Sequence, residues 1–432
     1  MRNFILFLFV TGILTYSLSS CKKSEETSTS TNDIKPPAGT YIKGSHLKGT
    51  LKGSLKPDSI YYLDGDMIVN KADSFGVSPG AKVIATGNYR IEIAGTLICN
   101  GTESKPITFT TSSEAIAYAN LGQTGYWGGF LIDSTSLYVS ITYTHINYTG
   151  GPDQTGSAQA SFDVEGSQQF NGGAKIIFED NWMFGGIDDG IHLVGDITCS
   201  IKRNVLQRLG GSDGDLINIK KGAHGDIAFN YIYSSANSGI KLNTSKTVPL
   251  PETRFNIYNN TIVNGNWRKI GELSSAIYLD ANSAGKVYNN VIVGCRNGIH
   301  LAKSATGCDM TNTSYGNNLM YMYYAQASDS SNVETNNPYI QGSNGVSQPT
   351  DKIAFGLTAC GTVFSHYDTD IKVCNLDHNV PSLASASPAL NAGTTSGTLF
   401  PYSIGSSMPL NKDMGAYPSD GHGNKHLPTQ KP

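Results

Sequence analysis

Two pairs of aspartates lie close together in the middle of the chain, Asp188 with Asp189 and Asp213 with Asp215. If neighbouring strands carry them, their carboxyl groups lie about 5 Å apart, and repulsion between two ionised carboxylates raises the pKa of one of them. An acid of raised pKa can donate a proton while the second carboxylate acts as base or nucleophile, as in glycoside hydrolysis. We therefore take these four aspartates, together with His224, as the candidate catalytic residues.

Two other interpretations of the aspartates remain open. Their oxygens suit Ca²⁺, which would be the cofactor of a β-elimination lyase that uses a nearby lysine as base. Alternatively, an Asp before Gly at the entrance of a strand binds the N–H groups of the turn, which would make the aspartates structural. The spacing of the Cys and His residues matches no zinc site, so we expect no structural metal.

The elements that must position these aspartates are short repeated strands. Phrases of the type Gly-Ile-His-Leu recur along the chain, and their first isoleucines are Ile191, Ile217, Ile240, Ile277 and Ile299. An Asn-containing phrase precedes each one and a sixth follows the last, and the asparagines are Asn181, Asn204, Asn230, Asn260, Asn290 and Asn318. Short alternating strands at a period of roughly 20 to 30 residues are typical of a solenoid, in which each repeat buries its apolar face against its neighbours. We predict an all-β solenoid over residues 59–340.

Alignment of the repeats on these isoleucines predicts two outward columns of polar side chains. The position two residues before the isoleucine is held by Asp189, Asp215, Ser238, Ser275 and Asn297. The position after the isoleucine is held by His192, Asn218, Lys241, Tyr278 and His300. These five residues and Lys220 are the candidate substrate-binding residues. The six asparagines are instead predicted to form an internal ladder at one corner, because Asn tolerates left-handed backbone geometry and its amide can bond to the next coil.

Several phrases resemble a known family of folds. The segments Gly95–Thr102, Lys105–Phe109 and Tyr126–Phe130 resemble the opening coils of right-handed parallel β-helix proteins of the pectate-lyase-like superfamily. This resemblance implies a right-handed parallel β-helix. The segments Ser387–Gly393 and Asp413–Tyr417 resemble the closing signature of exported bacterial β-helix proteins, with Asn391 where the common wording has Asp. They imply a loop-rich C-terminal cap over residues 341–432.

The acidic cluster carries a resemblance of its own. Asp188–Ile191, and Asp213–Lys220 followed by Gly222–Gly225, are similar to phrases of the polygalacturonase-type glycoside hydrolases. That similarity implies a polysaccharide as substrate. The sequence departs from the pattern at Ala223, which interrupts the Gly-His-Gly wording, and the spacing from Asp215 to His224 is too short for a full coil.

The N-terminus has the pattern of an export signal. A short positive region at Arg2 precedes the apolar run Phe4–Leu18, which is too short for a comfortable membrane span. The run ends in Leu18-Ser19-Ser20-Cys21, which resembles a bacterial lipobox. We therefore expect a signal peptide over residues 1–21 and a flexible tether over residues 22–58. We also expect a lipid on Cys21 that anchors the protein in the bacterial envelope, at the outer membrane.

Charge and cysteine content add two further expectations. The formal net charge is -3 and no basic stripe is present, so we expect no nucleic-acid partner. Export permits disulfide bonds, and the candidate pairs are Cys360 with Cys374 and Cys295 with Cys308. The alternative is a set of buried free thiols, which also includes Cys99 and Cys199.

Two functional hypotheses follow from these observations. In the first, the protein is a lipid-anchored envelope protein that binds polysaccharide along one face of the solenoid and could cleave it as a hydrolase or lyase. In the second, it is a non-catalytic structural or adhesion lipoprotein of the surface. Convergence of the four aspartates in a cleft with Lys or His would favour the first, and bonding to turn amides on a flat surface would favour the second.

Overall fold

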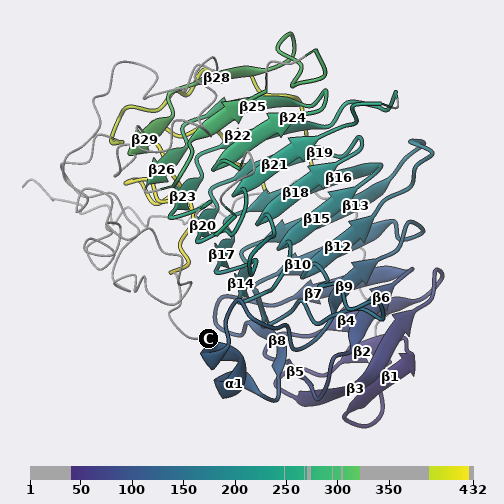
Figure 1. Ribbon diagram of the computed structural model, residues 1–432. Helices are drawn as coiled ribbons and strands as arrows, with labels where there is room; N and C mark the ends of the chain where they lie inside the picture. Colours follow the sequence, from purple (N-terminus) through teal and green to yellow (C-terminus); the bar gives the residue numbers. More distant parts are fainter. Residues whose placement is uncertain are drawn as a thin grey trace, which may run out of the picture. The chain divides into compact units, whose positions relative to one another are not determined.

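The computed structural model describes residues 40–247, 249–266, 268–269, 274–293, 295–302, 305–321 and 389–427. These residues form stacked coils of parallel strands, as Figure 1 shows, with one short helix, α1 (Glu114–Ala119). The prediction of an all-β, right-handed parallel β-helix is confirmed. The signal peptide, Cys21 and most of the tether lie outside the described residues.

Each complete coil contributes one strand to each of three columns. The first column is a ten-stranded sheet of β2 (Gly53–Leu55), β4 (Ser74–Val77), β7 (Thr96–Asn100), β10 (Tyr138–Thr142), β13 (Ala174–Glu179), β16 (Ile197–Lys202), β19 (His224–Ala228), β22 (Arg254–Tyr258), β25 (Ala284–Tyr288) and β28 (Ser314–Gly316). The second column contains β5 (Lys82–Ala85), β8 (Ile107–Thr111), β11 (Thr144–Asn147), β14 (Trp182–Phe184), β17 (Val205–Gln207), β20 (Tyr231–Tyr233), β23 (Thr261–Val263), β26 (Val291–Val293) and β29 (Leu319–Tyr321).

The third column carries the predicted outward face. It contains β6 (Arg90–Ile93), β9 (Gly129–Ile132), β12 (Phe162–Glu165), β15 (Ile191–Val194), β18 (Ile217–Lys220), β21 (Ile240–Asn243), β24 (Ile277–Asp280) and β27 (Ile299–Leu301). The long strand β3 (Ile60–Val69) pairs with both β5 and β6, and β1 (His46–Thr50) pairs with β3 at its edge. The strands therefore begin before residue 59, inside the range expected to be tether, because Leu47 and Leu55 are buried in the core.

The strand register confirms the alignment of the repeats. Ile191 pairs with Ile217, and the series continues through Ile240 and Ile277 to Ile299. All five side chains are buried in the apolar core of the solenoid. Because a shift of one residue would turn every one of these side chains to the opposite face, this register also fixes which polar residues face outward.

The asparagine ladder at the corner between the first and second columns is confirmed. In five of the six, Oδ1 accepts the backbone N–H of the equivalent asparagine one coil earlier, at 2.9 or 3.0 Å, and Oδ1 of Asn181 accepts the backbone N–H of Thr144 at 3.0 Å. Each Nδ2 donates to a backbone carbonyl of the preceding coil, at 2.8 or 2.9 Å. The left-handed conformation, however, is taken by the residue before each ladder asparagine, for example Arg203 with a φ of 54° before Asn204.

Residues 389–427, which we call the C-terminal strap, are the described part of the predicted cap. Their apolar side chains Ala389, Met414 and Ala416 pack on the outer face of the second column, over residues that include Val205 and Tyr231. The strap is drawn in yellow in Figure 1. It contacts the coils from the side, so that in its described part it covers outer side chains of both the first and the second columns and the corner between them.

Four of the cysteines lie in the described residues. Cys99, Cys199, Cys295 and Cys308 are buried free thiols, so the predicted disulfide between Cys295 and Cys308 is wrong and the free-thiol alternative is confirmed for these four. They fill space in the apolar interior as small hydrophobic side chains. Cys360 and Cys374 lie outside the described residues.

Candidate functional site

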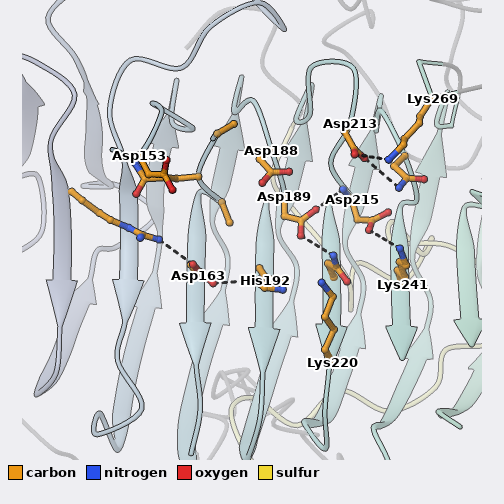
Figure 2. A pocket seen from close by; sticks show the side chains of 16 residues that line it. Asp153, Asp163, Asp188, Asp189, His192, Asp213, Asp215, Lys220, Lys241 and Lys269 are labelled. Atoms are coloured by element: carbon orange, nitrogen blue, oxygen red, sulfur yellow. Dashed lines mark hydrogen bonds and ion pairs between the residues drawn. The ribbon is translucent and has the colours of Figure 1, made fainter. Parts of the chain in front are cut away.

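A polar pocket of about 470 Å³ lies on the outer face of the third column. Figure 2 shows its side chains spread across neighbouring parallel strands and the turns that precede them. All but two of the lining residues are polar or charged; they are Arg90, Asp153, Ala158, Gln159, Ala160, Asp163, Asp188, Asp189, His192, Asp213, Asp215, Asn218, Lys220, Asn237, Lys241 and Lys269. We call this the acidic pocket.

The four aspartates singled out in the sequence all line the acidic pocket. Asp188 and Asp189 lie in the turn that leads into β15, and Asp213 and Asp215 lie in the equivalent turn one coil later, before β18. The parallel register stacks these two turns, because Ile191 and Ile217 are partners. The predicted substrate-binding residues His192, Asn218, Lys220 and Lys241 also line it, from β15, β18 and β21.

Asp189 and Asp215 also hold the turns together. The Oδ1 atom of Asp189 accepts a hydrogen bond of 2.7 Å from the backbone N–H of Asp215, and the Oδ1 atom of Asp215 accepts one of 2.7 Å from the backbone N–H of Ser238. The Oγ atom of Ser238 continues the series with the backbone N–H of Ser275 at 3.4 Å. Both carboxylates therefore bind N–H groups of the turns, which is a structural role. Both also line the acidic pocket.

Burial is the main cause of the raised pKa values of three of these aspartates. It raises the pKa of Asp215 to about 6, a shift that Asp189 adds to and Lys241 opposes. Burial also raises the pKa of Asp189, with a contribution from Asp188, and the pKa of Asp188. For Asp213 burial acts in the same direction, but a hydrogen bond from Lys269 outweighs it and lowers the pKa.

The sequence did not point to Asp163 and Arg90, which complete one end of the pocket. Asp163 on β12 is the register partner of His192, and its Oδ1 atom lies 2.9 Å from Nδ1 of His192. Arg90 on β6 donates from Nη2 to the other oxygen of Asp163 at 3.0 Å. Burial raises the pKa of Asp163, but these two partners outweigh burial and the pKa is lowered, so Asp163 is an ionised acceptor that orients the His192 ring.

The lysines of the pocket differ in their partners. Lys269 forms an ion pair with Asp213, and Nζ of Lys241 lies 3.6 Å from Oδ2 of Asp215. In Figure 2 both lysines point toward these aspartates. Lys220, at the end of β18, has no carboxylate partner among the described residues.

Two buried amides leave an acceptor unused at the pocket. Asn218 donates from Nδ2 to Oδ2 of Asp189 at 2.7 Å, but its Oδ1 atom has no hydrogen-bond partner among the residues that the structure describes. The Oδ1 atom of Asn237 likewise has none. These side chains are only 5% and 4% exposed, and an unpaired buried acceptor costs about 1 to 3 kcal/mol. Such groups are expected where a ligand or ordered water supplies the missing donor.

Three predicted site residues lie elsewhere. His224 is on β19 in the first column, where it bonds to Oγ1 of Thr198 at 2.8 Å, because the strand after β18 belongs to a different sheet. Tyr278 and His300 do continue the column of His192, but they are buried and stack on each other with ring centroids 4.7 Å apart. They do not line the acidic pocket, and no Phe, Tyr or Trp is among its lining residues.

The aspartates do not form a metal centre in the described part of the chain. No group of three or more His, Cys, Asp or Glu side chains is arranged there so that it could hold a metal ion. The Ca²⁺ site that a lyase would use is therefore not supported by these residues, and we derive no step through a metal ion.

No protein-family model, no curated protein and no solved structure matches this chain. The fold class thus rests on the strand topology, and the resemblance to the pectate-lyase-like superfamily stays a prediction. Within the described residues, no helix is long and apolar enough to span a membrane.

Proposed function

We propose that this protein binds a polysaccharide in the acidic pocket and hydrolyses a glycosidic bond with Asp215 as proton donor. The observation that carries the proposal is the meeting of Asp188, Asp189 and Asp215 in one pocket, with the pKa of Asp215 raised to about 6. An acid with this pKa keeps a substantial protonated fraction near neutral pH, as a general acid must. Its Oδ2 atom is not used by the backbone, since Oδ1 binds the N–H of Ser238.

The chemistry of the pocket suits a hydroxyl-rich ligand. Its lining offers carboxylates and amide oxygens that accept hydrogen bonds, and amide and ammonium groups that donate them. A sugar hydroxyl can pair with either kind of group, because it both donates and accepts. Since the lining contains no aromatic ring of Phe, Tyr or Trp, hydrogen bonds and charges would hold the sugar instead of stacking. The strands run parallel across the pocket, so a chain laid across the coils would meet Asp163, His192, Asn218 and Lys241 in succession.

The reaction requires a proton and a water molecule. Asp215 would transfer its proton to the glycosidic oxygen as the bond to the anomeric carbon breaks. Water would add to that carbon, and its proton would pass to a second water molecule in the pocket. Asp189 is less suited to take this proton, because both of its oxygens accept hydrogen bonds, from Asp215 and from Asn218.

The test uses the full chain in detergent with a panel of polysaccharides, and new reducing ends are measured. We expect Asp215→Asn to lower the rate by about 10² to 10⁴-fold, the usual contribution of a general acid. The control is Asp58→Asn, because Asp58 pairs with Lys105 and does not line the pocket. Cleavage that survives Asp215→Asn would refute the assignment of the acid.

A second candidate is a non-catalytic glycan-binding or adhesion protein. It is favoured by the hydrogen bonds from Asp189 and Asp215 to backbone N–H groups, which give both residues a structural reason to be present. Binding of a glycan without release of reducing ends, in the wild type and in Asp215→Asn alike, would favour this candidate.

We also propose that the protein is a pectate-lyase-like lipoprotein, attached by a lipid on Cys21 to the bacterial envelope, at the outer membrane. The lipobox-like wording at residues 18–21 supports this. Incorporation of a labelled fatty acid by the wild type and its loss in Cys21→Ser would test the anchor, and fractionation of the envelope would test the membrane.

A further inference from the structure

The charges of the acidic pocket are not balanced within the protein. Asp163, Asp213 and Asp215 each have a cationic partner, namely Arg90, Lys269 and Lys241. Asp153, Asp188 and Asp189 have none among the described residues. The carboxylate of Asp153 is used within its own turn, where Oδ1 accepts hydrogen bonds from the backbone N–H groups of Thr155 and Ser157. Within the described part of the chain, Asp188 and Asp189 are therefore the two adjacent carboxylates that lack a cationic partner.

Asp188 is the more open of this pair to a ligand. Asp189 accepts hydrogen bonds on both oxygens, whereas Asp188 accepts one from the neighbouring backbone N–H of Asp189. Removing a carboxylate from water is costly unless a cation or several donors compensate it. The raised pKa values of both groups agree with this, because burial is the main cause and outweighs the favourable effect of His192.

The unpaired amides of the same pocket also require donors. The Oδ1 atoms of Asn218 and Asn237 are buried acceptors without a partner. The Nε2 atom of His192 is a third buried atom without a partner, and it is an acceptor when Nδ1 donates to Asp163. Asn218 and Asn237 are nine-tenths or more buried. Among the described residues, the acidic pocket thus contains two carboxylates without a cationic partner and three buried atoms without a hydrogen-bond partner.

Two positive groups at the pocket lie away from Asp188. Lys220 is the last residue of β18, and in Figure 2 its side chain extends along the strand to the level of His192, whereas Asp188 lies in the turn before the strands. The Nε atom of Arg90 also lacks a partner, but its guanidinium is held at Asp163, at the end of the pocket formed by β6 and β12. These groups can take hydroxyl or ring oxygens of a sugar while leaving the site at Asp188 for a cation.

We propose that the glycan bound in the acidic pocket is an amino sugar polymer, with a protonated amine placed at Asp188. This inference rests on the proposed glycan-binding function and specifies its substrate class. An ammonium group carries three N–H donors and one positive charge, which match the carboxylate of Asp188 and a neighbouring amide oxygen. The hydroxyls of the same sugar supply the remaining donors.

The test compares oligosaccharides of equal length and linkage. The full chain in detergent is titrated calorimetrically at neutral pH with a glucosamine oligomer, its fully N-acetylated form and a glucose oligomer. We expect the glucosamine oligomer to bind about tenfold or more tightly than the other two, because only it carries ammonium groups. The preference should decrease with added salt, since it depends on charge.

Asp188→Asn is the decisive variant, because Asp188 takes no part in the hydrogen bonds between Asp189, Asp215 and Ser238 that hold the turns, and circular dichroism checks that it folds. It should abolish the preference for the glucosamine oligomer and leave binding of the glucose oligomer unchanged. Asp58→Asn is the control and should retain the preference. Equal binding of the glucosamine and glucose oligomers, or a preference that survives Asp188→Asn, would overturn this inference but not glycan binding. Failure of all three oligomers to bind would overturn both.

Discussion

The carboxylate of Asp189 accepts the backbone N–H of Asp215 across two neighbouring coils, at 2.7 Å from Oδ1. The same carboxylate binds Nδ2 of Asn218 through its other oxygen. A residue chosen from the sequence for its chemistry is thus also part of the framework that sets the position of Asp215. Removing the hydrogen bond and removing the charge at Asp189 should therefore have different effects.

The first prediction separates these two effects. Asp189→Ala should lower the free energy of unfolding by about 1 to 3 kcal/mol, because it leaves the N–H of Asp215 buried without an acceptor. Asp189→Asn keeps an acceptor for the N–H of Asp215, loses only the acceptor for Nδ2 of Asn218 and removes a carboxylate whose pKa burial has raised, so it should be more stable than Asp189→Ala at neutral pH. Urea unfolding of the three proteins measures this. Equal stability of the two variants would contradict the hydrogen-bonding role.

The second prediction concerns pH. Since burial raises the pKa of Asp215 to about 6, the folded protein binds a proton that the unfolded chain releases near its ordinary pKa of 3.8. Stability from this group is therefore present below pH 4 and is lost as the pH rises to about 6, by on the order of 3 kcal/mol. Asp215→Asn should remove this dependence. The unfolding free energy of the wild type minus that of the variant should therefore decrease from pH 4 to pH 7. A difference that stays constant over this range would contradict the prediction.

A third prediction addresses the asparagine ladder. The Oδ1 atom of Asn260 accepts from the backbone and side chain of Asn230, and its Nδ2 atom donates to the Ile227 carbonyl and to Asn290. Asn260→Ala should cost about 2 to 4 kcal/mol, since several buried groups lose partners at once. Asn70→Ala serves as the control, because Asn70 is exposed and makes one long hydrogen bond to Asp73. Similar losses in both variants would show that the ladder adds no special stability.

Attachment of the C-terminal strap gives a fourth prediction. Arg203 binds the buried carboxylates of Glu179 and Asp180 and donates from Nη1 to Oγ of Ser406 in the strap at 2.7 Å. Arg203→Leu should destabilise the protein by about 3 to 5 kcal/mol, because it leaves buried charges unpaired. It should also expose residues 389–427 to proteases, which mass spectrometry of the fragments detects. Lys105→Leu, at an exposed ion pair, should leave the strap protected.

The buried thiols lead to a fifth prediction. Burial raises the pKa of Cys99 and Cys199 above the ordinary value, and that of Cys295 to about 12, so these groups are protonated and unreactive at neutral pH. Alkylation followed by peptide mass spectrometry should label Cys99, Cys199, Cys295 and Cys308 in denaturant but not in the folded protein. Rapid labelling of Cys295 without denaturant would contradict its placement in the core.

The sequence was sufficient for the fold because the repeats carry their own register. The isoleucines from Ile191 to Ile299 become partners in adjacent coils, as their alignment predicts. The ladder asparagines could be found for the same reason, since each stands at a fixed distance before an aliphatic strand. Their backbone geometry could not be predicted, because the left-handed conformation is taken by the residue before each ladder asparagine. Residues as different as Arg203 and Phe229 take that conformation.

The candidate site was only partly predictable. Asp163 was missed because β12 has no phrase of the Gly-Ile-His-Leu type, although it pairs with the strand that does. His224 was included because it is near Asp215 in the chain, but in a coil of three strands the next strand lies on another face. Tyr278 and His300 follow the correct column, but their stacking removes them from solvent, and sequence alone does not reveal which members of a column are covered.

The C-terminal strap changes how the solenoid should unfold. In a linear array each coil touches only its neighbours, so the array can fray from an end one coil at a time. The strap bonds to Asn317 near one end of its path and to Asp180 near the other, through Ala392 and His426. It therefore links coils that do not touch one another and should make them unfold together. Because its residues follow these coils in the sequence and bond to them, this cooperativity can be established only when the coils that it contacts have formed.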